Sequence, residues 1–315
     1  VNNVAPAIAL TGNASVDEGA SYTLTLGTVS DPGTDAVSSY IVHWGDGSSD
    51  TYGSSGNVTH TYADGATAPT ITVDLVDEDG THLAAGSLAL SVLDVAPTAN
   101  VSGADSVAEG SAYALSVGPV NDPGADSITG YSIDWGDGTV ENLTPAQWAA
   151  ASGSFSHSYA DGAATPTITV SATDEDGTHA LGSKSLTVNN VAPAIALTGN
   201  ASVDEGASYT LTLGTVSDPG TDAVSSYIVH WGDGSSDTYG SSGNVTHTYA
   251  DGATAPTITV DLVDEDGTHL AAGSLALSVL DVAPTIAVSG AANAIEDTAY
   301  TLNLGGVSDP GADTV

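Results

Sequence analysis

The chain has 315 residues, 41% of them hydrophobic, and its 39 acidic residues face a single basic one, Lys184, for a formal net charge of −38. Because cysteine is absent, a disulfide framework, a thiolate metal site and a cysteine nucleophile are all excluded. So acidic a surface repels nucleic acids and anionic membranes, and we expect neither as a partner. Divalent cations or high salt must offset the repulsion among carboxylates that lack basic partners.

Internal repeats organise the chain. The tripeptide Val-Ala-Pro begins at Val4, Val95, Val191 and Val282, with spacings of 91, 96 and 91 residues. Residues 1–98 are identical to 188–285, which indicates duplication of a two-repeat unit. We predict four segments: repeat 1 at 1–94, repeat 2 with an insertion at 95–190, repeat 3 at 191–281, and the first two strands of a partial repeat 4 at 282–315. Both ends resemble cuts within a longer array, and no signal peptide is visible.

Alternation of large apolar residues with other residues predicts the strands of repeat 1. In chain order they are expected at 7–10, 21–26, 39–44, 58–62, 70–76 and 87–93, with a weaker strand near 50–52. Clusters of Gly, Asp and Pro at 11–20, 30–37, 45–49, 63–69 and 77–81 predict the turns between them. No helical period is visible. The pattern indicates an all-β chain of tandem immunoglobulin-like sandwiches in a linear array.

One motif, Trp-Gly-Asp-Gly, ends the third main strand of each repeat, beginning at Trp44, Trp135 and Trp231. We expect the Trp to be buried and the Gly-Asp-Gly to close a tight turn with positive φ. Its aspartate, Asp46 in repeat 1, is expected to cap that turn through its side chain. His60 and Tyr62 then point to one face of a strand, an arrangement that favours packing over catalysis.

The motif, the following His60-Thr61-Tyr62 and the Thr/Val-rich strand after it together resemble the PKD domain. The resemblance covers three nearly complete repeats and the start of the fourth. It implies PKD-type immunoglobulin-like sandwiches, which usually serve as spacers or interaction modules in secreted and surface proteins. The Val-Ala-Pro boundaries and Asp-Glu-Gly turns are also similar to those of large repetitive bacterial surface proteins. These resemblances imply an extracellular, cell-surface setting and name no ligand.

Acidic turns supply candidate metal ligands. In an immunoglobulin topology the loops at 31–35 and 77–79 share one end of the sandwich, and their hard oxygen ligands suit Ca²⁺. The candidates are Asp31, Asp35, Asp77 and Asp79 in repeat 1, Asp122, Asp126, Asp174 and Asp176 in repeat 2, and Asp218, Asp222, Asp264 and Asp266 in repeat 3. The alternative is that aspartate simply favours turns on an acidic surface.

A second arrangement places the ions between repeats. Glu18 or the linker residue Asp94 of one repeat could approach Asp122 and Asp174 of the next, as bottom loops, linker and top loops do in cadherin ectodomains. That likeness is geometric, because the linkers do not match the cadherin motif. The secondary candidate ligands are Glu18, Asp46, Asp94, Glu109, Asp137, Glu205 and Asp233.

Two function classes follow. A structural array, forming a surface stalk, fibre or layer rigidified by Ca²⁺, is favoured because near-identical repeats supply length, whereas an enzyme needs one site. The alternative is an adhesive module that recognises a glycan or a protein, although aromatic residues are only 5% and mostly point inward. No nucleotide-binding, hydrolase or metalloprotease motif is present, so we expect no enzyme.

The partial repeat 4 bears on partners. Two strands cannot bury an apolar face alone. Its missing strands either follow in the same chain or come from another copy of the protein, by end-to-end or lateral assembly. The longest mostly apolar stretch, 83–93, is too short to span a bilayer, so we expect no membrane insertion within this sequence.

Overall fold

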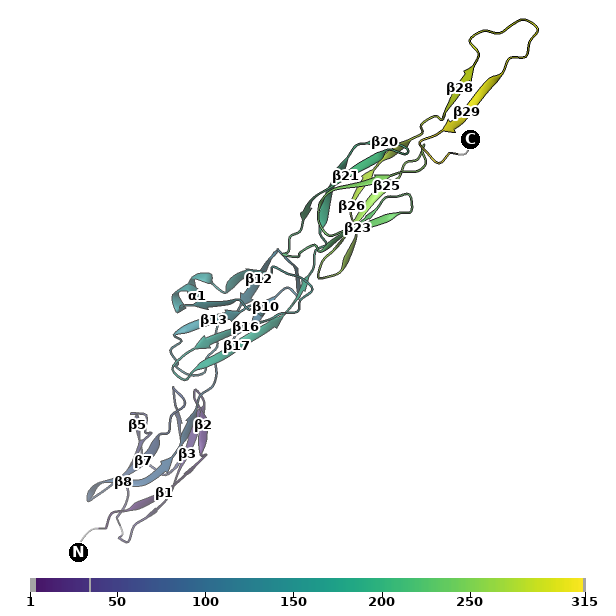
Figure 1. The fold of residues 1–315 in the computed structure, drawn as a ribbon. Helices are drawn as coiled ribbons and strands as arrows, with labels where there is room; N and C mark the ends of the chain where they lie inside the picture. Colours follow the sequence, from purple (N-terminus) through teal and green to yellow (C-terminus); the bar gives the residue numbers. More distant parts are fainter. Residues whose placement is uncertain (1–3, 34, 314–315) are drawn as a thin grey trace. The chain divides into compact units, whose positions relative to one another are not determined.

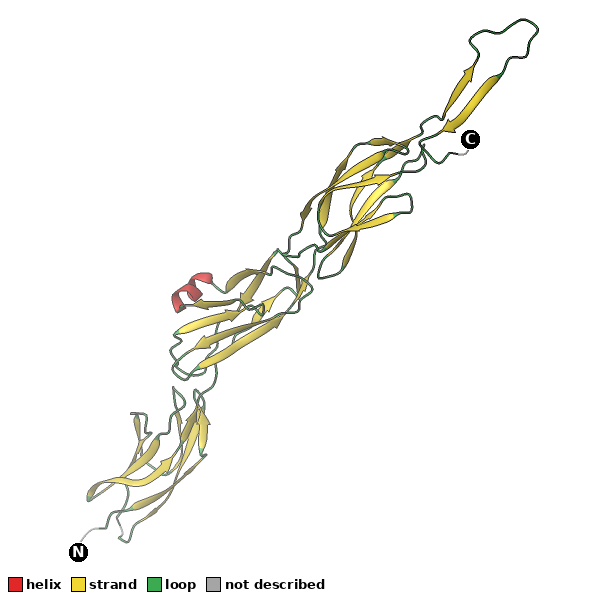
Figure 2. Ribbon diagram, viewed as in Figure 1, coloured by secondary structure: helices red, strands yellow, loops and turns green. Residues whose placement is uncertain are grey.

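The computed structural model describes residues 4–33 and 35–313, and strands make up nearly all of its regular structure (Figures 1 and 2). The fold class is therefore all-β, as predicted. The chain divides into two compact units, the first formed by Val1–Asp105, Tyr113–His157 and Pro166–Leu186, the second by Ser106–Ala112, Ser158–Thr165 and Thr187–Val315. All five boundaries between the units fall within repeat 2. Among the described residues, no helix has the length and apolar character needed to cross a membrane.

Repeat 1 is a sandwich of two antiparallel sheets. Its strands are β1 (Ala7–Gly12), β2 (Ser15–Asp17), β3 (Ser21–Ser30), β4 (Ser39–His43), β5 (Ser49–Tyr52), β6 (Gly56–Thr61), β7 (Thr70–Asp77), β8 (Gly80–Ala89) and β9 (Ser91–Leu93). One sheet has the order β1-β3-β6 and the other β5-β4-β7-β8, while β2 pairs in parallel with β9. The alternating apolar residues of both sheets point inward and form one buried core.

Trp44 lies at the centre of this core and is completely buried. Gly45 and Gly47 follow with φ of 87° and 94°, which confirms the predicted tight turn. The Tyr62 hydroxyl donates to the Trp44 carbonyl at 3.0 Å, and the Trp44 indole N–H donates to the Asp50 carboxylate at 2.8 Å. Strand, turn and the strand that carries Tyr62 are thereby tied together.

Repeats 2 and 3 have the same plan. Repeat 2 contains β10 (Val101–Gly103), β11 (Ser106–Ala108), β12 (Ala112–Val117), β13 (Gly130–Asp134), β14 (Val140–Leu143), α1 (Pro145–Ala151), β15 (Ser154–Ser158), β16 (Thr167–Thr173), β17 (Thr178–Ser185) and β18 (Thr187–Asn189). Repeat 3 contains β19 (Ala194–Gly199), β20 (Ser202–Asp204), β21 (Ser208–Ser217), β22 (Ser226–His230), β23 (Ser236–Tyr239), β24 (Gly243–Thr248), β25 (Thr257–Val263), β26 (Thr268–Ala276) and β27 (Ser278–Leu280). Each repeat has a three-stranded sheet, a four-stranded sheet and one parallel pair.

The insertion in repeat 2, for which the sequence predicted no secondary structure, forms the helix α1. Thr144 caps its first turn in a capping box with Gln147, and Pro145 occupies the first turn. The Trp148 ring stacks on Tyr131, with centroids 4.1 Å apart, and lies 4.9 Å from the ring of Phe155. The insertion therefore covers the sheet edge with its own aromatic side chains.

Two further strand predictions differ from the structure. Ser15–Asp17 was assigned to a turn but forms β2. The last strand was expected to begin at 87, whereas β8 already begins at Gly80, and β9 follows it after a break at Leu90. The sequence 81–86 lacks a strict alternation of apolar and polar residues, but its backbone still pairs with β7 across a bulge.

The described part of repeat 4 is one antiparallel pair, β28 (Thr285–Gly290) and β29 (Leu302–Ser308). Its large apolar side chains are exposed, among them Ile286, Val288 and Leu304. The two strands predicted for this segment are present, and in the structure their apolar face is open to solvent.

Candidate metal sites at the ends of the repeats

The acidic loops of repeat 1 meet at one end of the sandwich, as predicted. Carboxylate oxygens of Asp31, Asp35 and Asp77 lie within 4.8 Å of one another. Asp77 also accepts hydrogen bonds from the Asp79 backbone N–H at 2.9 Å and shares a 2.8 Å contact with His82 Nε2. Loss of solvation, followed by repulsion from Glu78, raises the pKa of Asp35. Three of the four predicted ligands thus converge, while the Asp79 backbone shapes the turn.

Glu18, at the opposite end of repeat 1, is 1% exposed. Its backbone N–H donates to the Leu93 carbonyl at 3.0 Å, because β2 pairs with β9 just before it. Its carboxylate Oε1 accepts the backbone N–H of Val95 in the linker at 2.9 Å. The other oxygen, Oε2, is buried without a hydrogen bond of normal geometry, against the backbone of Gly65. Loss of solvation is the largest effect on this carboxyl, and its pKa is raised.

The Asp-Pro-Gly-Ala-Asp loop of repeat 2, at 122–126, packs directly on this glutamate within one compact unit. The Ala125 backbone N–H donates to the Ala63 carbonyl at 2.7 Å. A Cβ at Gly124 would lie 2.6 Å from the Glu18 carboxyl carbon, so a side chain at this position would displace the glutamate carboxylate. The loop therefore reaches the preceding repeat through a close backbone approach.

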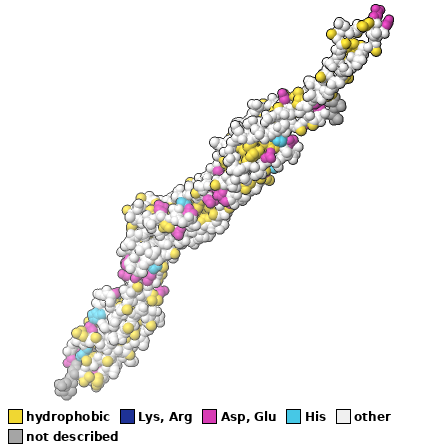
Figure 3. All heavy atoms as spheres, in the orientation of Figure 1, with side chains coloured by type: hydrophobic (Ala, Val, Ile, Leu, Met, Phe, Trp, Pro, Cys, Tyr) yellow, Lys and Arg dark blue, Asp and Glu magenta, His cyan; other side chains and the backbone are white. Residues whose placement is uncertain are grey.

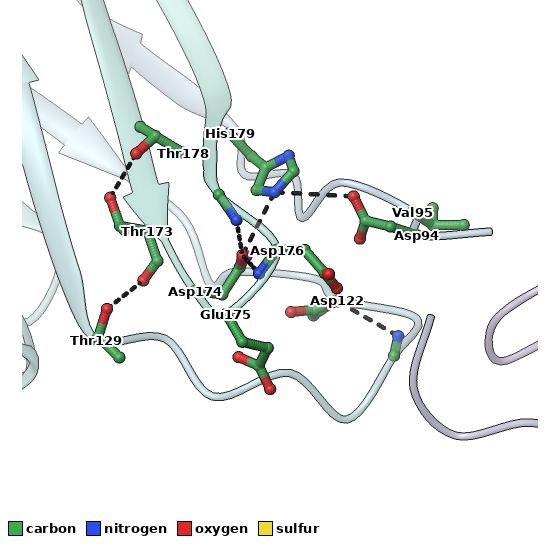
Figure 4. A network of polar contacts seen from close by, with 12 residues as sticks. Asp94, Val95, Asp122, Thr129, Thr173, Asp174, Glu175, Asp176, Thr178 and His179 are labelled. Atoms are coloured by element: carbon green, nitrogen blue, oxygen red, sulfur yellow. Dashed lines mark hydrogen bonds and ion pairs between the residues drawn. The ribbon is translucent and has the colours of Figure 1, made fainter. Parts of the chain in front are cut away.

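This contact gathers carboxylates from both repeats. Oxygens of Glu18, Asp122 and Asp126 lie within 4.8 Å of one another, and so do those of Asp64, Asp126 and Asp176. Figure 4 shows the approach of the linker: His179 lies 3.4 Å from Asp174 and 3.8 Å from Asp94. Acidic side chains also gather on the visible surface near this junction (Figure 3).

The same junction recurs twice in the second unit. Glu109 and Glu205 are as buried as Glu18, and their Oε1 atoms accept the N–H of Val191 at 2.7 Å and of Val282 at 2.8 Å. The clusters are Glu109, Asp161, Asp222 and Asp266 at one junction, and Glu205, Asp309 and Asp313 at the other. The docking bonds are Thr221 N–H to the Ala160 carbonyl, 2.9 Å, and Ala312 N–H to the Ala250 carbonyl, 2.7 Å.

The crowding of carboxylates at the junctions raises the pKa of an aspartate in the Asp-Pro-Gly-x-Asp loop of the later repeat. Loss of solvation, then the charge of Glu18, raises the pKa of Asp126 to about 6. Loss of solvation, then the charge of Glu109, likewise raises the pKa of Asp222 to about 6. Carboxylates this crowded need either protons or a cation to coexist.

The aspartate of the Trp-Gly-Asp-Gly turn has a different role. Asp46 Oδ1 accepts the Ser48 backbone N–H at 2.9 Å, which confirms the predicted cap, and Oδ2 lies 2.7 Å from His60 Nε2. The His60 ring stacks on Trp44 with centroids 4.7 Å apart. Against the effect of burial, the bonds from Ser48 and His60 lower the pKa of Asp46 to about 2. Asp233 in repeat 3 is held in the same way, and Asp137 in repeat 2 contacts His157 at 2.6 Å.

Comparisons with known proteins identify no family for this chain. No protein-family model matches the chain, and no curated protein matches it. Among solved structures, the fibronectin(III)-like modules of CbhA from Clostridium thermocellum share 18% identity, over 57% of this chain and 94% of theirs, with a TM-score of 0.24. The FN1–FN3 domains of chicken CNTN1 share 10% identity, over 88% of this chain and 100% of theirs, with a TM-score of 0.27.

Sequence reasoning had named Glu18, Glu109, Glu205 and the linker residue Asp94 only as secondary candidates, and it had not named Asp64, Asp161, Asp309 or Asp313. A signal was present. Asp-Pro-Gly-x-Asp occurs at 31–35, 122–126, 218–222 and 309–313, and each of the last three copies comes one repeat after a Glu-Gly dipeptide. The Glu-Gly turn of one repeat contacts the Asp-Pro-Gly-x-Asp loop of the next at each described junction. In the sequence, only the constant order of these two motifs in successive repeats indicates this contact.

Proposed function

We propose that the chain is a structural segment of an extracellular, cell-surface protein, built from PKD-type immunoglobulin-like repeats and stiffened by Ca²⁺. The observation that carries this proposal is the junction. One docking hydrogen bond and one close glycine contact join each described repeat to the next, three times in succession. A chain that builds the same joint repeatedly is suited to setting length and spacing.

The proposal includes Ca²⁺ because the junctions between repeats are acidic. The chain holds 39 acidic residues and one lysine, so protein cations cannot neutralise the repeat ends. Oxygen ligands on turns suit Ca²⁺, which accepts six to eight such ligands in flexible geometry. An ion that binds the folded chain and not the unfolded one stabilises it by mass action.

The test uses the 315-residue chain. Its melting temperature and small-angle X-ray scattering profile are measured in millimolar Ca²⁺, in EGTA, and in EGTA with NaCl at matched ionic strength. We expect Ca²⁺ to raise the melting temperature and to narrow the distribution of particle lengths beyond what NaCl achieves. Identical melting curves in Ca²⁺ and in EGTA would contradict the calcium part of the proposal.

An adhesive role is the second candidate, and one observation favours it. Among the described residues, only repeat 2 carries a stacked pair of this kind, Tyr131 and Trp148, and both side chains are partly exposed. Aromatic faces of this kind are suited to sugars or to a protein ligand. Binding of the chain to a glycan array, abolished by Trp148→Ala, would support adhesion. A blank array would leave the structural role as the sole proposal.

A further inference from the structure

We propose that each junction between successive repeats is a Ca²⁺ site built by both repeats, with the buried glutamate of the Glu-Gly turn as its central ligand. These glutamates are Glu18, Glu109 and Glu205. The second aspartate of the following Asp-Pro-Gly-x-Asp loop faces each of them: Asp126, Asp222 and Asp313. The inference rests on the proposed function and deepens it, because it moves the ion from within a repeat to the joint between repeats.

The buried glutamates point to a ligand independently of the acidic clusters. Each is 1% exposed or less; in each, the linker N–H donates to Oε1, and Oε2 is buried without a hydrogen bond of normal geometry. Burying a carboxylate with an unsatisfied oxygen is unfavourable unless a positive charge faces it. The clusters around these glutamates consist of carboxylates alone, and the single basic residue of the chain, Lys184, pairs with Asp105. A cation at Oε2 satisfies the oxygen and the charge together.

The geometry suits calcium. Oxygens on opposite sides of a Ca²⁺ ion are about 5 Å apart, since each lies 2.3–2.6 Å from the metal. At the junction of repeats 2 and 3, oxygens of Glu109, Asp161, Asp222 and Asp266 all lie within 4.8 Å of one another. Mg²⁺ usually keeps several waters and takes one or two carboxylates, whereas four carboxylates converge at this junction. Hard carboxylate ligands alone also disfavour Zn²⁺, which takes nitrogen and sulfur.

Repeats 1 and 3 form an internal control, because they have the same sequence but different surroundings. In repeat 3 the loop packs on Glu109, and three of its oxygens are buried without partners: Asp218 Oδ2 and both oxygens of Asp222. In repeat 1 the same loop has no preceding repeat among the described residues, and only Asp31 Oδ2 is in that state. Packing of this loop on the preceding repeat therefore leaves its carboxylate oxygens buried without partners. A cation is thus needed at the junction between the repeats.

The linker residue differs among the three junctions. The linker residue is Asp94 at the first junction and Asp281 at the third, but Asn190 at the second. The Asn190 side-chain N–H donates to Asp266 there, so this junction has one negative charge fewer. Affinity for Ca²⁺ rises with the number of charged ligands, and we therefore expect the second junction to bind more weakly than the first.

The test changes the glutamates of the two repeats with identical sequence and keeps Glu109 as an internal reference. Glu18→Gln/Glu205→Gln is compared with the control Asp17→Asn/Asp204→Asn, which removes the same charge from the exposed neighbouring residues. Glutamine still accepts the linker N–H, so the fold is expected to survive, and far-UV circular dichroism checks it. Tightly bound Ca²⁺ is counted by isothermal titration calorimetry on the full chain.

We expect the glutamine variant to lose about two thirds of the tightly bound Ca²⁺ and the control to lose none. Wild-type stoichiometry and affinity in the glutamine variant would overturn the inference, and so would an equal loss in the control. Neither result touches the proposed function if Ca²⁺ still raises the melting temperature of the wild-type chain. A different result would contradict the proposed function: the wild-type chain would have the same melting temperature in EGTA and in Ca²⁺.

Discussion

Replacing Trp44 with alanine should unfold repeat 1 selectively. Trp44 is completely buried among residues of both sheets, and truncating such a side chain costs about 3–5 kcal/mol. The His60 ring loses the stacking partner that lies 4.7 Å away, and the partly buried Asp50 bond is lost as well. We therefore expect about 4 kcal/mol, a large share of the roughly 5–15 kcal/mol that stabilises a typical domain.

For a repeat of this size, 1 kcal/mol corresponds to about 4–8 °C in melting temperature, so repeat 1 should melt about 20 °C below the rest of the chain. Circular dichroism should show a new early transition. Hydrogen exchange with mass spectrometry assigns it, but only peptides that carry the substitution are informative, because residues 1–98 and 188–285 are identical.

Trp231→Ala is the matched variant, since it removes the same side chain from the same sequence in repeat 3. Equal losses would show that the cost is local to the core, whereas a smaller loss in repeat 3 would measure support from the docked repeats on either side. Trp44→Phe should cost less than Trp44→Ala because it preserves most of the apolar volume. A loss below about 1 kcal/mol in Trp44→Ala would refute the central role of the indole in the core.

Three further substitutions test single contacts. The double substitution Asp46→Asn/Asp233→Asn should make stability less sensitive to acid. The pKa of each carboxyl is lowered to about 2, so its stabilising contribution is complete above the ordinary pKa of 3.8 and is lost as the pH falls toward 2. In urea unfolding, the wild type should lose about 1 kcal/mol more stability than the variant between pH 5 and pH 2.5, after allowance for partial exposure. Tyr62→Phe should cost about 1–3 kcal/mol in chemical unfolding, because the buried Trp44 carbonyl loses its hydroxyl donor, and an effect within error would contradict this. Gly220→Ala should loosen the second junction, because the new Cβ would lie 2.8 Å from the Glu109 carboxyl carbon. Gly33→Ala is the control: it lies in the same local sequence, but its Cβ would meet only its own loop, at 3.2 Å or more. Equal proteolysis of the linker at 189–193 in both variants would argue against the docking contact.

Much of the sandwich could be predicted from local sequence. Strand alternation at Tyr22, Leu24 and Leu26 determines which face is buried, because side chains of a strand alternate with a period of two. The Trp-Gly-Asp-Gly turn was predicted with its buried Trp and its aspartate cap, since glycine conformation and side-chain capping act over a few residues. The helix α1 was missed because its seven residues are too few to display a helical period.

The junction depended on tertiary structure. Asp17 and Glu18 are adjacent acids in one turn, and nothing in their sequence distinguishes them, yet Asp17 is exposed and Glu18 is 1% exposed. The pairing of β2 with β9, more than seventy residues along the chain, turns Glu18 toward the linker, and the loop of repeat 2 then covers it. Composition alone determined that the carboxylates lack cationic partners. Which of them lose water could be decided only by the fold, because desolvation depends on atoms that another repeat brings into contact.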